Sequence, residues 1–266
     1  MVQRLRHPQD YEEATMKNKF KLGLLSLVVL SLVITLPTIP ASAQWAGTWV
    51  SSIQIMNLGN STANVVVEYY REDGTRVDEA TRSYTITVGS AVNIFQPNVP
   101  GLPDNFKGSA IVSADQPIAA IGSEQTTYSD GSIGNSQYSG FGAEAVGTKF
   151  YLPNVNRKFG GSQWSSRITI QNTTANPVTA TVIFYNSDGT TRDTDVVNLP
   201  GYGSTTLTQI NDSELPEGWL GAAIVEATSN IAVIVDVMSA DGRLETYNGF
   251  TSGATTMYLP TLLIGF

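Results

Sequence analysis

Three acidic residues in apolar surroundings are the candidates for acid–base chemistry. Glu124, Glu226 and Asp236 lie in or beside apolar segments, where burial raises the pKa of a carboxyl group. Two carboxyl groups with different pKa values can hydrolyse a glycosidic bond without any histidine. Glu226 and Asp236, however, have no acidic counterparts in the internal repeat described below, and the chain lacks the large loops that build a sugar cleft. We therefore predict that these residues are not catalytic.

Composition excludes nucleophilic catalysis that depends on histidine or cysteine, and the usual zinc and copper sites. The chain has no cysteine, and its single histidine, His7, precedes a predicted signal-peptide cleavage site. A mature chain without histidine and cysteine cannot form Ser–His–Asp or Cys–His machinery, nor the usual zinc and copper ligand sets. The prediction is a protein that is not an enzyme.

Acidic residues in turn-like segments offer oxygen ligands for calcium. They are Glu72, Asp73, Asp188, Asp193 and Asp195. Asp-Gly is also the preferred two-residue hairpin turn, and no D-x-D-x-D-G loop is present. We predict that Asp73 and Asp188 form turns and that no cofactor is bound. Calcium binding by these acidic residues is the alternative.

The four tryptophans, Trp45, Trp49, Trp164 and Trp219, could form a stacking platform for carbohydrate. Trp49 and Trp164 occupy equivalent positions in the repeat, and Trp219 is equivalent to Phe106. Aromatic residues that recur in this way are typical of packing positions. We therefore predict a packing role for them.

The N-terminal segment has the features of an export signal. A basic stretch at 17–21 precedes an apolar run from Leu22 to Leu36, and Ala41-Ser42-Ala43 follows. This order predicts a signal peptide over residues 1–43, cleaved after Ala43, and hence a secreted or cell-surface protein. An uncleaved anchor is the alternative, since 22–39 is barely long enough to span a bilayer. The translation start, Met1 or Met16, stays open.

The remaining chain contains an internal duplication. Seven blocks recur in the same order at an offset that changes from 115 to 107 residues, as expected when loops differ in length. The clearest are 49–57 with 164–172, 65–75 with 180–190, 108–112 with 221–225, and Tyr151-Leu152-Pro153 with Tyr258-Leu259-Pro260. We predict two domains, 44–156 and 157–266, joined by a linker at 156–161.

Each copy has the pattern of a β-sandwich. Apolar residues alternate with period two, as at Ile53 and Ile55, and the segments 64–70 and 179–185 are β-branched and aromatic. Residues 117–121 and 231–235 are expected to be strands buried on both faces. About seven strands per copy predict an all-β protein of two tandem immunoglobulin-like or fibronectin-like β-sandwich domains.

The recurring blocks Ile-x-Ile-x-Asn, Tyr-x-x-Asp-Gly-Thr, Gly-Ser/Ala-Ala-Ile-Val and Tyr-Leu-Pro are similar to the tandem Ig-like repeats of secreted bacterial surface proteins. The resemblance covers residues 45–266. It implies a sandwich fold in an envelope or extracellular setting, and no particular activity.

Charge restricts the partners. Residues 44–266 carry 10 of the 15 basic and 20 of the 23 acidic residues, a net charge of −10. Such a surface repels phosphate backbones, so no nucleic-acid partner is expected. No later segment reaches eighteen uninterrupted apolar residues, so no transmembrane segment is expected in the mature chain. The partners expected are other copies of the chain, envelope proteins or polysaccharide.

The chain ends on an uncharged apolar segment. It is a possible assembly strand that includes Tyr258, Leu259, Leu262, Leu263, Ile264 and Phe266. If the Tyr-Leu-Pro strand closes the domain before it, both domains are complete, and this closed form is the preferred prediction. If it opens the domain after it, the first domain lacks a strand and the terminal one is unpaired, which would permit head-to-tail assembly.

We therefore predict a non-catalytic structural or adhesive component of the cell envelope or extracellular matrix, such as a surface-layer or filament subunit. The alternative is a carbohydrate- or protein-binding module that is accessory to a secreted enzyme.

Overall fold

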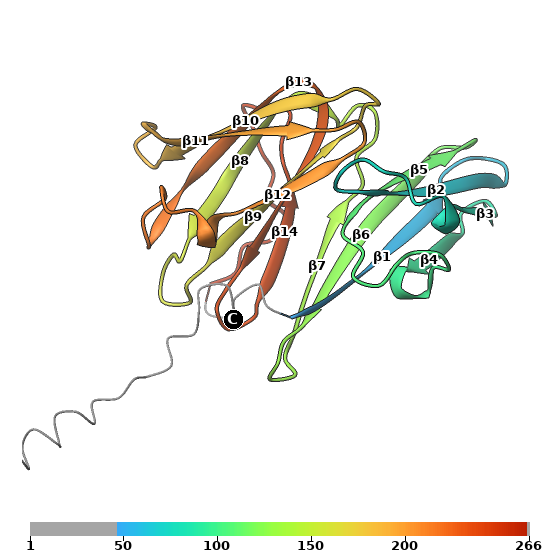
Figure 1. Ribbon diagram of the computed structural model, residues 1–266, viewed down its shortest axis with the longest axis horizontal. Coiled ribbons are helices and arrows are strands. Elements are labelled where there is room, and N and C mark those ends of the chain that lie inside the picture. Colours follow the sequence, from blue (N-terminus) through green and yellow to red (C-terminus); the bar gives the residue numbers. More distant parts are fainter. Residues whose placement is uncertain (1–46, 265–266) are drawn as a thin grey trace, which may run out of the picture. The chain divides into compact units, whose positions relative to one another are not determined.

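The computed structural model describes residues 47–264, in which the regular elements are strands and three short 3-10 turns (Figure 1). The chain is all-β and forms several sheets, consistent with a β-sandwich, so the predicted fold class is confirmed at this level. The predicted signal peptide, Trp45 and Phe266 lie outside the described residues. Among the residues described, no helix is long and apolar enough to cross a membrane.

Within residues 47–264 there are fourteen strands, with the following bounds: β1 Thr48–Asn57, β2 Ala63–Arg71, β3 Arg82–Ile86, β4 Ala91–Phe95, β5 Gly108–Ala114, β6 Ile118–Thr127, β7 Ile133–Ser139, β8 Gly147–Arg157, β9 Ser165–Asn172, β10 Val178–Asn186, β11 Thr191–Leu199, β12 Ser204–Thr208, β13 Trp219–Met238 and β14 Leu244–Asn248. The 3-10 turns are η2 Asp78–Ala80, η3 Gln96–Asn98 and η4 Gln209–Asn211.

Strands β1 to β7, called the first repeat below, form two sheets with the orders β4-β1-β6-β7 and β3-β2-β5. Alternate residues of β2, namely Val65, Val67 and Tyr69, are buried in one apolar cluster with Ile55 and Ile94. The period-two pattern of the sequence therefore places these side chains inward, as a strand with one buried face requires.

Strands β8 to β14, called the second repeat below, form one seven-stranded sheet because β13 is shared by two sets of strands. The N-terminal half of β13 pairs with β10 and β8, and its C-terminal half pairs with β9 and β14. In the first repeat the counterpart of β13 is divided into β5 and β6. Pro117 precedes β6 there, and its missing N–H cannot contribute to a continuous ladder.

Strand β8 belongs to the sheet of the second repeat, and the predicted boundary at 156/157 therefore differs from the structure. Leu152 of β8 lies opposite Ala223 of β13, and Phe150 lies opposite Val225. The reason is packing, because Phe150, Leu152 and Val155 are at most 1 % exposed within the apolar cluster of the second repeat.

The predicted linker at 156–161 is instead the end of β8 and a tight turn. The Phe159 N–H donates to the Trp164 carbonyl at 2.8 Å, and the Trp164 N–H donates back to the Phe159 carbonyl at 2.9 Å. The connection between β7 and β8 is the segment 140–146.

The two Asp-Gly hairpin turns are confirmed. Gly74 and Gly189 adopt φ values of +80° and +81°, which favour glycine. The carboxylates of Asp73 and Asp188 each accept a hydrogen bond at 2.9 Å from the backbone N–H of the threonine two residues later. These bonds, with those from the threonine side chains, lower the pKa of both carboxyl groups.

Candidate functional site

Two of the three candidate carboxylates meet at one arginine. Arg167 of β9 donates to Asp236 of β13 through Nε at 2.8 Å and Nη2 at 2.6 Å, and its Nη2 lies 3.3 Å from Glu124 of β6. The Trp49 ring covers the guanidinium at 4.5 Å, and the Thr246 hydroxyl donates to Asp236 at 2.7 Å. The first and second repeats therefore meet at a charged cluster, defined here as Glu124, Arg167 and Asp236.

Burial sets the protonation of this cluster. Asp236 is fully buried, and the Glu124 side chain is 20 % exposed. Desolvation, followed by the negative charge of Asp236, raises the pKa of Glu124 to about 8, against the opposing effect of Arg167. Glu124 is thus largely a neutral acid at pH 7 beside an ion pair. The same desolvation raises the pKa of the nearby Tyr138 hydroxyl.

Sequence reasoning missed Arg167 as the centre of this cluster. The signal in the sequence was Arg167 itself, a single basic residue directly before the apolar segment Ile168-Thr169-Ile170. In the β9–β13 ladder, Arg167 lies directly opposite Asp236. The partnership with Glu124 had no signal in the sequence, since it depends on contact between the two repeats.

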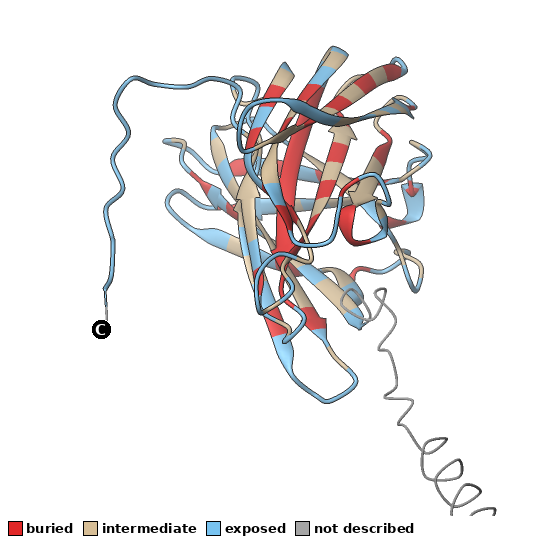
Figure 2. Ribbon diagram, turned by 90° about the vertical axis from the view of Figure 1, so that its left-hand side faces the viewer, coloured by how far each residue is buried: buried red, intermediate tan, exposed pale blue. Residues whose placement is uncertain are grey.

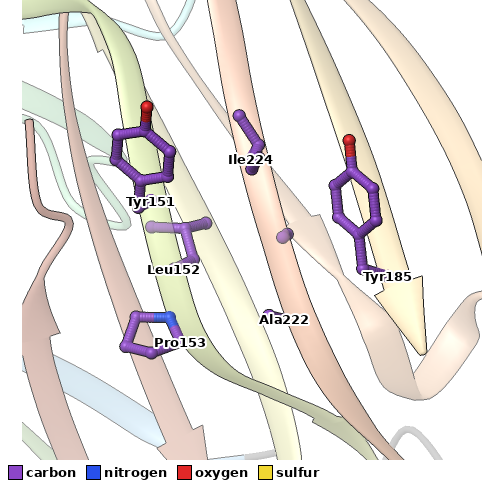
Figure 3. A pocket seen from close by; sticks show the side chains of 7 residues that line it. Tyr151, Leu152, Pro153, Tyr185, Ala222 and Ile224 are labelled. Carbon is purple, nitrogen blue, oxygen red and sulfur yellow. The ribbon is translucent and has the colours of Figure 1, made fainter. Parts of the chain in front are cut away.

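The third candidate carboxylate, Glu226, is not part of this cluster. It is half-exposed on the outer side of β13, where Lys149 of β8 approaches it at 2.8 Å. Close to it lies a shallow apolar depression of about 280 Å³, with the rings of Tyr151 and Tyr185 on its two sides (Figure 3). Its other lining residues are Leu152, Pro153, Ala222, Ala223 and Ile224, so no carboxylate faces into it.

The acidic residues considered for calcium separate into two groups. Asp73 and Asp188 are engaged in their turns, and Glu72 forms an ion pair with Lys107 at 2.7 Å. Asp193 and Asp195 lie with Asp212, their carboxylate oxygens within 4.8 Å of one another. Desolvation and the charges of Asp212 and Asp193 raise the pKa of Asp195. These three carboxylates are the group among the described residues that could hold a cation.

The described tryptophans pack against the protein. Trp219 is 6 % exposed, contacts Phe184 edge-on, and donates its indole N–H to Asn186 at 3.0 Å. Its counterpart Phe106 contacts Tyr69 in the same edge-on manner. The indole rings of Trp49 and Trp164 each lie against an arginine, Arg167 and Arg243 respectively. The predicted packing role is thus met, although arginine stacking was not foreseen.

The first repeat has an uncovered edge at β5. Among the described residues, β5 pairs with β2 and has no strand on its other side. At the equivalent position of the second repeat, β8 pairs with β13. Ala223, Val225, Ile231 and Val233 of β13 are at most 1 % exposed. Their counterparts in β5 and β6, namely Ala110, Val112, Ile118 and Ala120, are only half-buried. The absence of a β8 equivalent in this region leaves the apolar interior accessible.

This accessibility corrects the expectation for residues 117–121. The segment 231–235 is buried on both faces, as predicted. By contrast, Ala119 is exposed, Ile121 is 40 % exposed, and Ile118 and Ala120 are only partly covered. Two stretches of similar sequence therefore differ because their neighbours differ.

Two equivalent glycines, Gly140 of the first repeat and Gly249 of the second, have different neighbours. A Cβ atom on Gly249 would lie 2.9 Å from side-chain atoms of both Phe150 and Leu152. For a Cβ atom on Gly140, the three nearest atoms all belong to Ala120, at 3.3 to 3.8 Å. The side chains nearest to Gly249 are thus those of β8, whereas no such side chain is among the nearest atoms to Gly140.

The C-terminal segment 251–264 forms no strand and leaves the sheets as an exposed stretch (Figure 2). Its apolar side chains are exposed to an unusual degree: Met257 64 %, Tyr258 89 %, Leu259 70 %, Leu262 80 %, Leu263 70 % and Ile264 100 %. Contiguous exposed apolar residues of this kind mark an interaction site. The closed form preferred from the sequence is wrong for the described residues, because this segment does not pair within the second repeat.

Comparisons with known proteins show no relationship that assigns a family. No family model matches the chain, and no curated protein matches it. A crystal structure of Thermotoga maritima 1070 is 14 % identical over 39 % of this chain and 92 % of that one, with a TM-score of 0.32.

Two β-glucuronidase structures are also similar in part. One, from glycoside hydrolase family 2, is 11 % identical over 79 % of this chain, with a TM-score of 0.17. A calcium-binding mutant of Bacteroides uniformis β-glucuronidase 2 is 12 % identical over 82 %, with a TM-score of 0.15. This chain spans only 22 % and 26 % of those two chains. TM-scores this low support no inference about function.

Proposed function

We propose that the protein is a non-catalytic structural component of the cell envelope or extracellular matrix, a surface-layer or filament subunit that associates with copies of itself. Its two tandem Ig-like domains would follow a signal peptide cleaved after Ala43. One observation carries the proposal: within residues 47–264, the first repeat has a counterpart of every strand of the second except β8, and residues 257–264 form an exposed segment whose sequence is similar to that of β8.

The charged cluster supports a structural role. Both oxygens of the buried Asp236 carboxylate accept hydrogen bonds, from Arg167 and from Thr246. Arg167 is held in turn by Glu124 and Trp49, so these groups bind each other across the two repeats. Removing one member of such a buried ion pair is strongly destabilising. The cluster therefore accounts for its acidic residues without a substrate.

The test is the assembly state of residues 44–266. Size-exclusion chromatography with light scattering, and electron microscopy of the same fractions, should show oligomers or filaments that grow with concentration. The matched control ends at Gly253 and lacks the exposed terminal segment, so it should be a monomer. A full-length chain that stays monomeric at every concentration would contradict the proposal.

The alternative, a carbohydrate- or protein-binding module, is favoured by the depression between Tyr151 and Tyr185. Aromatic rings on either side of small residues can stack on a sugar face. A Tyr185→Ala variant would then lose binding to a polysaccharide array that the unaltered chain binds, whereas no binding by either chain would exclude a polysaccharide ligand of that array.

A further inference from the structure

The residues that cover β13 in the second repeat recur at the end of the chain. Aligned at an offset of 107, β8 residues Phe150, Leu152, Pro153 and Val155 correspond to Met257, Leu259, Pro260 and Leu262. In β8 the side chains of Phe150, Leu152 and Val155 point into the core, while Tyr151 between them is 41 % exposed. The terminal segment thus has large apolar residues at every position where β8 buries one.

The proline is compatible with a strand at that place. The β8–β13 register shifts between the pairs Val155–Gly221 and Leu152–Ala223, so Pro153 lies in a bulge. Proline is tolerated in strands at bulges because its missing N–H breaks no ladder bond there. Pro260 occupies the equivalent position, and the terminal segment can therefore adopt the same backbone path.

Building on the self-association proposed above, we propose that residues 257–264 of one copy form a strand antiparallel to β5 of a second copy. The register follows from the second repeat, in which Leu152 opposes Ala223, Phe150 opposes Val225 and Val155 opposes Gly221. Transferred to the first repeat, Leu259 opposes Ala110, Met257 opposes Val112 and Leu262 opposes Gly108. Leu259 and Met257 then lie beside Gly140.

A second copy is the proposed occupant because the terminal segment has the apolar pattern of β8 and, among the described residues, belongs to no strand. The segment after β7 enters the repeat that follows it as β8, and Phe141 at the start of this connection contacts Phe150 edge-on. The segment after β14 is equivalent in sequence, with Phe250 in the place of Phe141. In the proposed contact, the first repeat of a second copy takes the place of the repeat that follows.

Two segments of the same molecule are rival occupants. The terminal segment could turn back onto its own β5. Residues before β1 also contain Leu36-Pro37-Thr38, which matches Leu259-Pro260-Thr261, and cleavage after Ala43 would remove them. A mature chain that retains residues 35–43 would overturn the proposal, since it would carry its own occupant.

Because the chain has no cysteine, engineered pairs can report the register. One sample carries Ala110→Cys, another carries Leu259→Cys, and the two are dissociated, mixed and oxidised. Opposed strand residues lie about 5 Å apart at Cα, within disulfide range. The expected result is a cross-linked dimer on a non-reducing gel. The control pair Val112→Cys and Leu262→Cys is about 13 Å out of register and should not cross-link.

The outcomes separate this proposal from the proposed function. Oligomers that form without the Ala110–Leu259 cross-link overturn the strand register and leave self-association standing, whereas an absence of oligomers overturns both. A doubly substituted chain that cross-links within a monomer assigns the terminal segment to its own first repeat, and also refutes the proposal.

A matched pair of substitutions gives a second readout. Leu259→Asp places a charge in the apolar interior and should weaken association at least about 100-fold. Thr261→Asp, equivalent to the exposed Asn154, should leave association within about 3-fold because its side chain faces solvent. Equal losses for both variants would contradict the inward–outward alternation.

Discussion

Glu124→Gln should remove a pH dependence that the unaltered protein carries. The folded state raises the pKa of this carboxyl from 4.5 to about 8, so between these values the folded chain binds more protons than the unfolded chain. Stability is then fully present below pH 4.5 and is lost as pH rises toward 8. The lowered pKa values of Asp73 and Asp188 act in the opposite direction, but only at pH values below about 4.

The size of the effect follows from the shift. One pKa unit corresponds to about 1.4 kcal/mol, so ionising Glu124 in the folded state costs at most about 5 kcal/mol of unfolding free energy. Its side chain keeps 20 % of its surface in water, and Arg167 lies 3.3 Å away. We therefore expect a measured loss of roughly 2–3 kcal/mol between pH 5 and pH 8.5. The neutral glutamine should abolish this slope and make the variant more stable than the unaltered chain at pH 8.5.

The assay is urea unfolding followed by tryptophan fluorescence at pH 5, 6.5 and 8.5, at one fixed protein concentration because association shifts apparent stability. Glu226→Gln is the matched control. Glu226 is half-exposed and paired with Lys149, so its loss should change the unfolding free energy by less than about 0.5 kcal/mol and preserve the slope. A slope that survives Glu124→Gln would refute the assignment of the pH dependence to this cluster.

Two further predictions follow from the packing and from the sequence. Trp219→Ala should destabilise the protein by about 3–5 kcal/mol, because the ring is only 6 % exposed, packs against Phe184 and donates its N–H to Asn186. Chemical denaturation measures this loss of stability, and a change below about 1 kcal/mol would contradict the packing role. N-terminal sequencing of secreted protein should begin at Gln44, and recovery of residues 22–43 in a membrane fraction would show an anchored chain instead.

Local features of the fold were predictable because they depend on neighbouring residues. The alternation in β2, with Val65, Val67 and Tyr69 inward, requires only the two-residue period of a strand. The Asp73-Gly74 turn requires a glycine at positive φ and a short carboxylate that accepts the N–H of Thr75.

The membership of β8 was not predictable in the same way. The inward-facing residues Phe150, Leu152 and Val155 would suit either repeat. Their pattern predicts which face of the strand is apolar, but it does not predict against which of the two cores that face packs. The choice is made by long-range contacts with Ala223 and Val225. For the same reason the sequence presented Glu124 and Asp236 as separate candidates, whereas Arg167 brings them together.

In the proposed contact, the acceptor is the edge of β5, and the inserted strand is the exposed segment at 257–264 of another copy. The two surfaces differ, so the proposed contact would be heterologous. Such a contact produces an open polymer unless its rotation happens to close a ring. Each end of such a polymer would keep an uncovered β5 edge or an exposed terminal segment, so further subunits would add there.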